Sequence, residues 1–263
     1  MLGEGSGAIL VKALDAALAA GDRVHAVIEA VSVNNDGRTM GLTTPSPSAQ
    51  EQLVRDALEK AGVTARSVSY VEAHGTGTMI GDPIELQALT RAFRADTDDA
   101  GFCVVGSVKP NVGHLLMAAG MAGLHKVILA VGRQVVPPSI HCDTPNSRFA
   151  FDSSPFRLVR SAVPWPAQEG VRRAGLSSFG FGGTNGHLLL RGLTDAERAA
   201  RTAVREAGPP PAFKGRRYWL EDRPAPRPVA RPPAAVSAAP AGNGARQAAW
   251  TDLLTFDEGT FEQ

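Results

Sequence analysis

Apolar and polar residues recur with two different periods along the first part of the chain. Residues 24–33, VHAVIEAVSV, are rich in β-branched side chains and run into the turn-forming stretch NNDGR, which predicts a strand. Residues 51–62, EQLVRDALEKAG, place apolar side chains three and four positions apart, which predicts a helix with one buried face. Ser48 and Glu51 stand in capping-box register before this helix, and Gly62 is a natural stop.

The alternation of strand-like and helix-like stretches continues. Residues 67–73, SVSYVEA, and residues 102–108, FCVVGSV, predict two further strands. Between them, Asp82 in the cap position and Pro83 in the first helical position predict the start of a helix. The apolar stripe of this helix consists of Leu86, Leu89 and Phe93.

The most apolar stretch of the chain, residues 115–131, is predicted to belong to a helix that starts near Asn111. It is rich in glycine and alanine and carries a histidine and a lysine, which suits a buried helix of a soluble protein better than a membrane span. Gly120 and Gly123 allow such a helix to pack very closely against a neighbour.

The pattern then changes. Residues 133–141, 156–165 and 172–192 have the character of strands and turns without helices between them, which predicts a layered α/β domain with a strand-rich end. Thr194 and Glu197 stand in capping-box register at the start of one more surface helix.

The last part of the chain has a different composition. Residues 208–245 hold about half of the nineteen prolines, which predicts a disordered linker. Within it, residues 213–221, FKGRRYWLE, carry three aromatic side chains and are expected to dock onto a folded body. Residues 250–263 are acidic with spaced apolar side chains, a pattern that fits either a segment that folds on a partner or a plain disordered tail.

Composition narrows the possible functions. The 263 residues are 43% hydrophobic and 20% charged with a net charge of +1, so no global field attracts nucleic acid or an anionic membrane. Cys103 and Cys142 lie far apart without metal-ligand spacing, which predicts no metal site and fits a reducing compartment. The N-terminus lacks the pattern of a signal peptide. We therefore expect a soluble, cytoplasmic protein whose function resides in a site.

The first candidate group is His74 in HGTGT, directly after a predicted strand. Gly75 and Gly77 remove side chains on either side, so that a ligand can approach the backbone while Thr76 and Thr78 offer hydroxyl groups. The alternative is a tight turn with a surface histidine.

The second candidate is His114 in KPNVGH. If Asn111 caps the helix, His114 falls in its first turn, where the positive end of the helix dipole opposes protonation. A neutral imidazole donates a hydrogen bond without adding charge. Lys109 either pairs with a carboxylate such as Glu72 and fixes the geometry, or lies on the surface.

The third candidate is the glycine-rich stretch SFGFGGTNGH. Glycines around Phe181 allow close approach of backbone to a ligand, and the backbone N–H groups of such a turn are good oxyanion donors. Thr184 and Asn185 are available as polar anchors. Because glycine-rich turns between strands are common, this stretch alone is a weak signal.

Taken together, three stretches resemble the second half of a β-ketoacyl synthase of the thiolase fold, specifically the ketosynthase domain of a modular polyketide synthase. They are residues 71–85, VEAHGTGTMIGDPIE; residues 105–130, VGSVKPNVGHLLMAAGMAGLHKVILA; and residues 172–187, RRAGLSSFGFGGTNGH. The likeness runs from about residue 3 to residue 190. It implies an α/β fold, the C-terminal half of a thiolase-like fold, with a layered mixed sheet and packed helices.

Four segments are expected: the ketosynthase half (1–193), a helix and wrap-back linker (194–222), a disordered Pro/Ala-rich linker (223–246) and an acidic amphipathic tail (247–263) as a docking motif.

The resemblance also implies roles for the candidate residues. His74 and His114 would hold the malonyl thioester carbonyl and stabilise the enolate that forms when carbon dioxide leaves. Lys109 would be the active-site lysine of the family, held by an ion pair with Glu72, with Asn111 in support. Decarboxylative Claisen condensation places negative charge on a thioester oxygen, which two fixed neutral donors stabilise.

Substrate binding follows from the same likeness. Thr76 and Thr78 would hydrogen-bond the phosphopantetheine arm of an acyl carrier protein. Phe181 and Gly182 would line the acyl pocket, with Phe181 as its gate and its backbone N–H in the oxyanion hole. The chain itself is expected to bind no cofactor and no metal.

The nucleophile of the family is absent. A cysteine in a motif such as DTACSSS does not occur in this sequence. Cys103 lies in an apolar strand, and Cys142 lies beside His141, a neighbour that usually cannot reach the thiol. The expected partners are therefore an N-terminal half with the cysteine, an acyl carrier protein and a second ketosynthase in a homodimer.

Alternatives remain open at this point. The chain fits a subunit of a split enzyme, a truncated reading frame of a longer synthase, or a non-catalytic docking or scaffold remnant. A thiolase-like enzyme acting on coenzyme A thioesters is disfavoured, because it needs a second cysteine where this chain has GFGGTNGH. A solitary second half would expose the apolar helix, so we expect the chain alone to self-associate.

Overall fold

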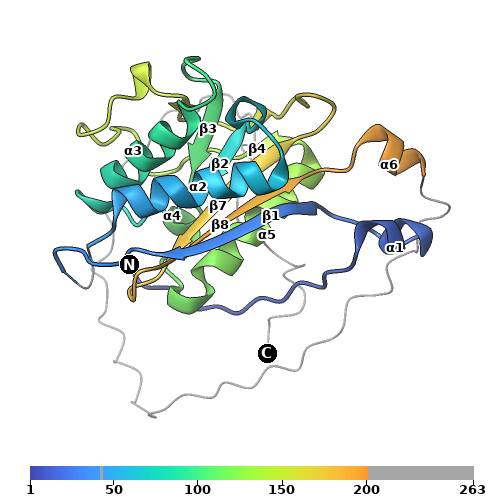
Figure 1. Ribbon diagram of the computed structural model, residues 1–263, viewed down its shortest axis with the longest axis horizontal. Coiled ribbons are helices and arrows are strands. Elements are labelled where there is room, and N and C mark those ends of the chain that lie inside the picture. The colour runs from blue at the N-terminus through green and yellow to red at the C-terminus, as the bar shows by residue number, and fades with distance from the viewer. Residues whose placement is uncertain (42–43, 201–263) are drawn as a thin grey trace, which may run out of the picture. The chain divides into compact units, whose positions relative to one another are not determined.

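The computed structural model describes residues 1–41 and 44–200 of the chain (Figure 1). The helices are α1 (Leu14–Ala19), α2 (Pro47–Ala61), α3 (Gly81–Phe93), α4 (Lys109–Val112), α5 (Ala119–Arg133) and α6 (Asp195–Ala199), with short 3₁₀ turns at Ala65–Ser67, Leu116–Ala118 and Phe151–Ser153. The strands are β1 (Val27–Asn35), β2 (Tyr70–Glu72), β3 (Cys103–Gly106), β4 (Val135–Val136), β5 (Phe156–Arg157), β6 (Val163–Pro164), β7 (Arg173–Phe179) and β8 (Thr184–Arg191). The predictions for the linker, the aromatic stretch and the acidic tail lie outside the described residues.

A mixed six-stranded sheet organises the described part of the chain. Its strand order is β1-β8-β7-β2-β3-β5, and β4 pairs with β6 separately. β2 runs parallel to both β3 and β7, β3 runs parallel to β5, and the pairs β1–β8 and β7–β8 are antiparallel. The predicted layered mixed sheet, with strands and helices alternating before a strand-rich end, is therefore confirmed.

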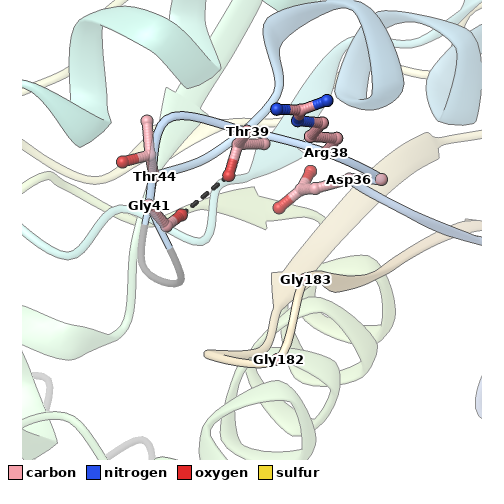
Figure 2. A pocket seen from close by; sticks show the side chains of 8 residues that line it. Asp36, Arg38, Thr39, Gly41, Thr44, Gly182 and Gly183 are labelled. Atoms are coloured by element: carbon pink, nitrogen blue, oxygen red, sulfur yellow. Dashed lines mark hydrogen bonds between the residues drawn. The ribbon is translucent and has the colours of Figure 1, made fainter.

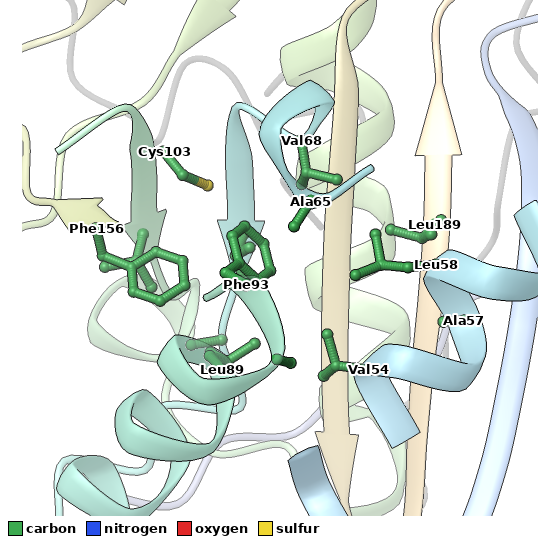
Figure 3. Packing of buried hydrophobic residues seen from close by; sticks show 14 of the residues in the cluster. Val54, Ala57, Leu58, Ala65, Val68, Leu89, Phe93, Cys103, Phe156 and Leu189 are labelled. Atoms are coloured by element: carbon green, nitrogen blue, oxygen red, sulfur yellow. The ribbon is translucent and has the colours of Figure 1, made fainter. Parts of the chain in front are cut away.

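Hydrophobic clusters cover both faces of this sheet. Val71 on β2 belongs to a cluster with α2 and α3, whereas its neighbour Tyr70 belongs to a cluster with α5. Successive strand side chains point to opposite faces, so the helices lie on two sides of one sheet, as Figure 1 shows. In the first cluster Phe93 of α3 packs against Phe156 of β5, with ring centroids 5.0 Å apart (Figure 3).

The starts of two helices differ from the sequence prediction. α2 is capped by Ser46, whose hydroxyl accepts a hydrogen bond from the N–H of Ala49, so the prediction of a Ser48 cap was wrong. Pro47 occupies the first helical position, which suits its fixed φ and missing N–H. α3 begins at Gly81, and Asp82 lies inside its first turn without capping it. The predicted stop at Gly62, in left-handed conformation, is confirmed, as is the capping box of Thr194 with Glu197.

The apolar helix also begins later than expected. α5 starts at Ala119, after the separate short helix α4 and a 3₁₀ turn, and Asn111 lies inside α4. Gly113, with φ of 78°, interrupts the path between them. His114 is consequently a loop residue, and the prediction that it occupies the first turn of the long helix was wrong.

The close packing of α5 through its glycines is confirmed. A Cβ atom at Gly123 would lie 2.8 Å from Leu176 Cδ1, and one at Gly120 would lie 2.8 Å from Ser178 Oγ, both on β7. By length and composition alone, one described helical stretch, Leu116–Arg133, could cross a membrane. Its packed face against the sheet is that of a core helix.

Candidate active site

The candidate residues meet at one edge of the sheet. His74 follows the end of β2, Lys109 and His114 follow the end of β3, and Phe179 ends β7. These three strands are parallel neighbours, so their carboxyl ends lie side by side. In open α/β sheets this edge is where ligands usually bind.

The two histidine rings lie close together. The centroids of His74 and His114 are 5.6 Å apart, and the rings meet edge to face at 82°. Phe179 packs against His74 with a centroid separation of 5.3 Å. Two residues forty positions apart in the sequence therefore share one small region of the structure.

Backbone hydrogen bonds set the tautomer of both rings. The N–H of Phe179 donates to Nδ1 of His74 at 3.3 Å, and the N–H of Leu116 donates to Nδ1 of His114 at 3.1 Å. In a neutral imidazole the nitrogen that accepts a hydrogen bond carries no proton, so the proton resides on Nε2. Each ring then has an N–H donor available on Nε2.

Electrostatics keep both rings neutral. Burial lowers the pKa of His74 to about 3, with further lowering by the charge of Lys109 and by His114. Burial, the charge of Lys109 and the chain's amino group lower the pKa of His114. The expected neutral state thus arises from burial and a neighbouring ammonium, because His114 is not at a helix N-terminus.

Lys109 and Glu72 do not form the expected ion pair. The ammonium of Lys109 donates to the backbone carbonyl of His74. Glu72 pairs instead with Lys126 of α5, with Nζ 2.8 Å from Oε2, and both side chains are almost fully buried. Glu72 also accepts hydrogen bonds from the hydroxyl of Tyr70 at 2.7 Å and from the N–H of Val108 at 2.6 Å.

Sequence reasoning missed the part played by Lys126. The sequence did contain a signal for this pairing. Lys126 shares a helix face with Ala122 and Ala130, four residues before and after it, and a lysine on a buried apolar face needs a charged partner. Sequence reasoning also missed Glu85, a buried residue of α3 whose two carboxylate oxygens accept from the N–H groups of His74 at 2.7 Å and Gly75 at 2.9 Å. Burial raises the pKa of Glu85 to about 7.

The threonines lie on the exposed loop after His74. The hydroxyls of Thr76 and Thr78 are 3.4 Å apart, and the Thr78 hydroxyl accepts from the N–H of Gly81. Gly75 and Gly77 have φ of 47° and 73°, the left-handed region that a glycine enters without strain. The loop therefore presents two hydroxyls to solvent beside the histidines.

The glycine-rich stretch forms the turn between β7 and β8. Phe181 is 69% exposed, and the N–H groups of Phe181 and Gly182 have no acceptor within residues 1–41 and 44–200. A cavity of about 340 Å³ lies between this turn and the loop after β1 (Figure 2). Its lining residues are Asp36, Gly37, Arg38, Thr39, Gly41, Thr44, Gly182 and Gly183.

The remaining candidates contribute less. Asn111 is exposed, and its side chain makes no hydrogen bond to any residue that the structure describes. Burial raises the pKa of both cysteine thiols, with Cys103 fully buried in β3 and Cys142 half-buried, so neither is a thiolate at neutral pH. Residues 1–41 and 44–200 contain no group of three metal-ligating side chains.

Comparison with known proteins identifies the relatives of this chain. The family model "Beta-ketoacyl synthase, C-terminal domain" matches residues 25–143, and "Ketoacyl-synthetase C-terminal extension" matches residues 145–211. The chain is 46% identical over 193 residues to polyketide synthase PksM of Bacillus subtilis, covering 72% of this chain and 4% of that protein. It is 45% identical over 220 residues to polyketide synthase ThaG of Burkholderia thailandensis, covering 82% of this chain and 4% of that protein.

Solved structures agree as well. The ketosynthase from module 6 of the bacillaene synthase of Bacillus subtilis 168 is 43% identical, with a TM-score of 0.68 over 70% of this chain. The match covers 33% of that ketosynthase chain. The chain therefore spans a small part of the curated relatives and about a third of the solved ketosynthase.

Proposed function

The chain carries the C-terminal domain and C-terminal extension of a β-ketoacyl synthase related to the ketosynthases of modular polyketide synthases, and on this premise we propose that it supplies the two histidines of a decarboxylative condensation. The substrates are an acyl thioester on a cysteine of an N-terminal half and a malonyl thioester on an acyl carrier protein. The product is a β-ketoacyl thioester on the carrier protein.

The reaction needs a stabilised negative charge on one oxygen. As the bond between the malonyl methylene and its carboxylate breaks, carbon dioxide leaves and the electron pair moves onto the thioester oxygen as an enolate. The Nε2–H groups of His74 and His114 donate hydrogen bonds to this oxygen. The enolate carbon then attacks the acyl carbonyl, the new carbon–carbon bond forms, and the cysteine leaves as thiolate.

The observation that carries this proposal is the closeness of the two rings, whose centroids are 5.6 Å apart and which each accept a backbone N–H at Nδ1. A protonated histidine would quench the enolate by giving it a proton, whereas a neutral Nε2–H stabilises charge and keeps its proton. Burial and Lys109 lower the pKa of both rings, which keeps them neutral throughout the physiological range. The oxyanion of the acyl group is held by the free N–H of Phe181 in the β7–β8 turn.

The partners follow from the same chemistry. An N-terminal half provides the cysteine, and the phosphopantetheine arm of the carrier protein lies along Thr76 and Thr78 beneath the Phe181 gate. The chain needs no cofactor of its own. The solved relatives are ketosynthases. By analogy with that family, the proposal places this chain in the cytoplasm as part of a homodimer.

The test uses this chain together with a cysteine-bearing N-terminal ketosynthase half. H74A and H114A should each lower condensation by at least about a hundredfold while loading of the acyl group onto the cysteine continues, since alanine has no side-chain N–H and removing one oxyanion donor costs about 10²–10³ in rate. H25A is the matched control, because His25 is exposed and remote in sequence from the site. Condensation that survives H74A or H114A undiminished contradicts the proposal.

A second candidate function is a non-catalytic docking or scaffold piece. It is favoured by one observation, the absence of a DTACSSS-like cysteine motif from the sequence. The same assay separates the two functions. A scaffold piece binds its partner equally well in wild-type, H74A and H114A forms and yields no condensation product in any of them.

A further inference from the structure

One buried carboxylate links the two segments that carry the histidines. Glu72 is 1% exposed and precedes His74 by two residues at the end of β2. Its Oε1 accepts the N–H of Val108 at 2.6 Å, directly before the segment that carries Lys109 and leads to His114. A displacement of Glu72 would therefore move both histidine-bearing segments.

Lys126 ties this carboxylate to α5. Its Nζ lies 2.8 Å from Glu72 Oε2, the oxygen that also accepts from the hydroxyl of Tyr70. The space for the pair depends on Gly106, where a Cβ atom would lie 2.9 Å from the Tyr70 hydroxyl and 3.6 Å from Lys126 Nζ. α5 also approaches closely enough that a Cβ at Gly123 would lie 3.2 Å from Glu72 Cγ.

Stability alone does not account for this pair. Replacing a buried ion pair by apolar side chains of similar volume is often neutral or stabilising, because the desolvation of both charges offsets their attraction. The hydrogen bond that Glu72 accepts from Tyr70 lies within β2, whereas those from Val108 and Lys126 join β2 to the segment before α4 and to α5. This arrangement favours a role in geometry.

We propose that Lys126 is a positioning residue for the condensation: by anchoring Glu72 to α5, it fixes the spacing between His74 and His114. The inference rests on the proposed function and adds to it a residue that touches neither substrate nor histidine. Lys126 acts indirectly. It holds Glu72, which ends β2 close to His74 and also accepts the N–H of Val108 in the segment that leads to His114.

The test compares three variants of the full chain, each completed by a cysteine-bearing N-terminal half. K126M should lower the kcat of condensation by about tenfold or more, since small misplacements of catalytic groups cost up to about 10² in rate. Acyl loading of the partner cysteine should be unchanged. The double variant E72Q/K126M removes the unpaired buried charge, so its Tm should exceed that of K126M while kcat stays low.

R173M is the matched control. Arg173 forms a similarly buried ion pair with Glu29, with Nε 2.6 Å from Oε2, at the opposite end of β7 from Phe179. It should lower Tm and leave kcat within about twofold of wild type. A folded K126M with wild-type kcat, or a double variant that recovers wild-type kcat, overturns the proposal. If K126M fails to fold, the double variant decides.

A second readout needs no catalysis. Nitrogen NMR of the histidine rings of the isotope-labelled 263-residue chain, in complex with an unlabelled N-terminal half and assigned with H74A and H114A, reports their environments and tautomers. In E72Q/K126M the signals of His74 and His114 should shift while that of His25 stays in place. Unshifted signals in the folded double variant overturn the positioning role. Since this measurement is independent of turnover, it holds even if H74A and H114A show that the condensation proposal is wrong.

Discussion

At the residue scale, buried titratable groups make the stability of this chain depend on pH in two opposing directions. Burial lowers the pKa of His187 to about 4 and that of His74 to about 3, from an ordinary value of 6.5. Between pH 4.5 and 6.5 the unfolded chain holds these protons and the folded chain does not, so acidification destabilises the fold. Burial raises the pKa of Glu85 from 4.5 to about 7, and its contribution to stability is lost as the pH rises through 7.

The lowered pKa values of His74, His114 and His187 outweigh the raised pKa values of Glu85 and Asp82, which predicts a net loss of stability as the pH falls from 6.5 to 4.5. In wild type, His187 takes up one proton on unfolding in this pH window, and H187Q cannot. The slope of the unfolding free energy against pH should therefore fall by about 1.4 kcal/mol per pH unit. Urea unfolding at several pH values in this window measures the slope. H25Q, at an exposed histidine, should keep the wild-type slope. An unchanged slope in H187Q would show that His187 titrates normally in the fold.

The site residues show which features of the site the sequence could predict and which it could not. The motif HGTGT correctly placed His74 directly after a strand, whereas KPNVGH led to the wrong prediction that His114 lies in the first turn of the long helix. Neighbouring parallel strands nevertheless bring the two rings together. The partner of Glu72 could not be chosen from sequence. Lys109 and Lys126 both follow Glu72 in the chain. The sequence does not reveal that the face of α5 that carries Lys126 packs on the sheet beside Glu72.

At the element scale, the cap of α2 offers a direct comparison of two neighbouring serines. Ser46 accepts the hydrogen bond of Ala49, and Ser48 lies within the first turn. S46A should lower the free energy of unfolding by about 1 kcal/mol, the usual value of an N-cap. S48A should change it by less than half as much. Chemical denaturation of both variants measures the difference, and equal effects would contradict the capping assignment.

Two glycines of α5 should respond oppositely to the same substitution. At Gly123 an added Cβ meets Leu176 and Glu72, so G123A should destabilise the fold by about 1–3 kcal/mol through overpacking. At Gly132 an added Cβ meets no atom of the described chain within 4 Å, so G132A should stabilise the helix by up to about 1 kcal/mol. Thermal unfolding compares the pair. A stabilising G123A would mean that α5 does not sit as close to β7 and Glu72 as described.

The helices and strands also show why the sequence predicts the type of an element more accurately than the residue at which it begins. Apolar periodicity identified the strands and the long helices correctly, because burial of one face dictates it. The starts of α2, α3 and α5 were each misplaced. A capping motif does not specify where the preceding loop ends. In this structure α2 begins at Pro47, α3 begins at Gly81, and Gly113, with positive φ, separates α4 from the later start of α5.

At the scale of the whole molecule, the mixed order of the sheet was beyond sequence reasoning. Alternating strands and helices predict a parallel core, and β2, β3 and β7 form one. The insertion of β7 and β8 between β2 and β1 depends on long-range pairing that no local pattern specifies. The resemblance to the ketosynthase family implied a layered mixed sheet but not this strand order.

The described surface carries several large apolar side chains that are exposed to solvent. Leu10 is 99% exposed and Val11 67% exposed in a segment without assigned secondary structure, and Val31 and Val33 project from edge strand β1 at 48% and 65%. Exposed apolar patches of this kind mark interfaces or sites of aggregation.

We therefore expect the chain expressed alone to self-associate, with a sedimentation coefficient that rises with concentration. Co-expression with a cysteine-bearing N-terminal half should yield a defined complex instead, because that half buries the apolar surface. The double variant L10K/V33K should reduce both self-association and complex formation, since charge at a buried interface is costly. The exposed substitution E59K on α2, whose other face packs on the sheet, is the control and should change neither. A wild-type chain that sediments as a monomer at every concentration would show that these apolar residues tolerate water and need no partner.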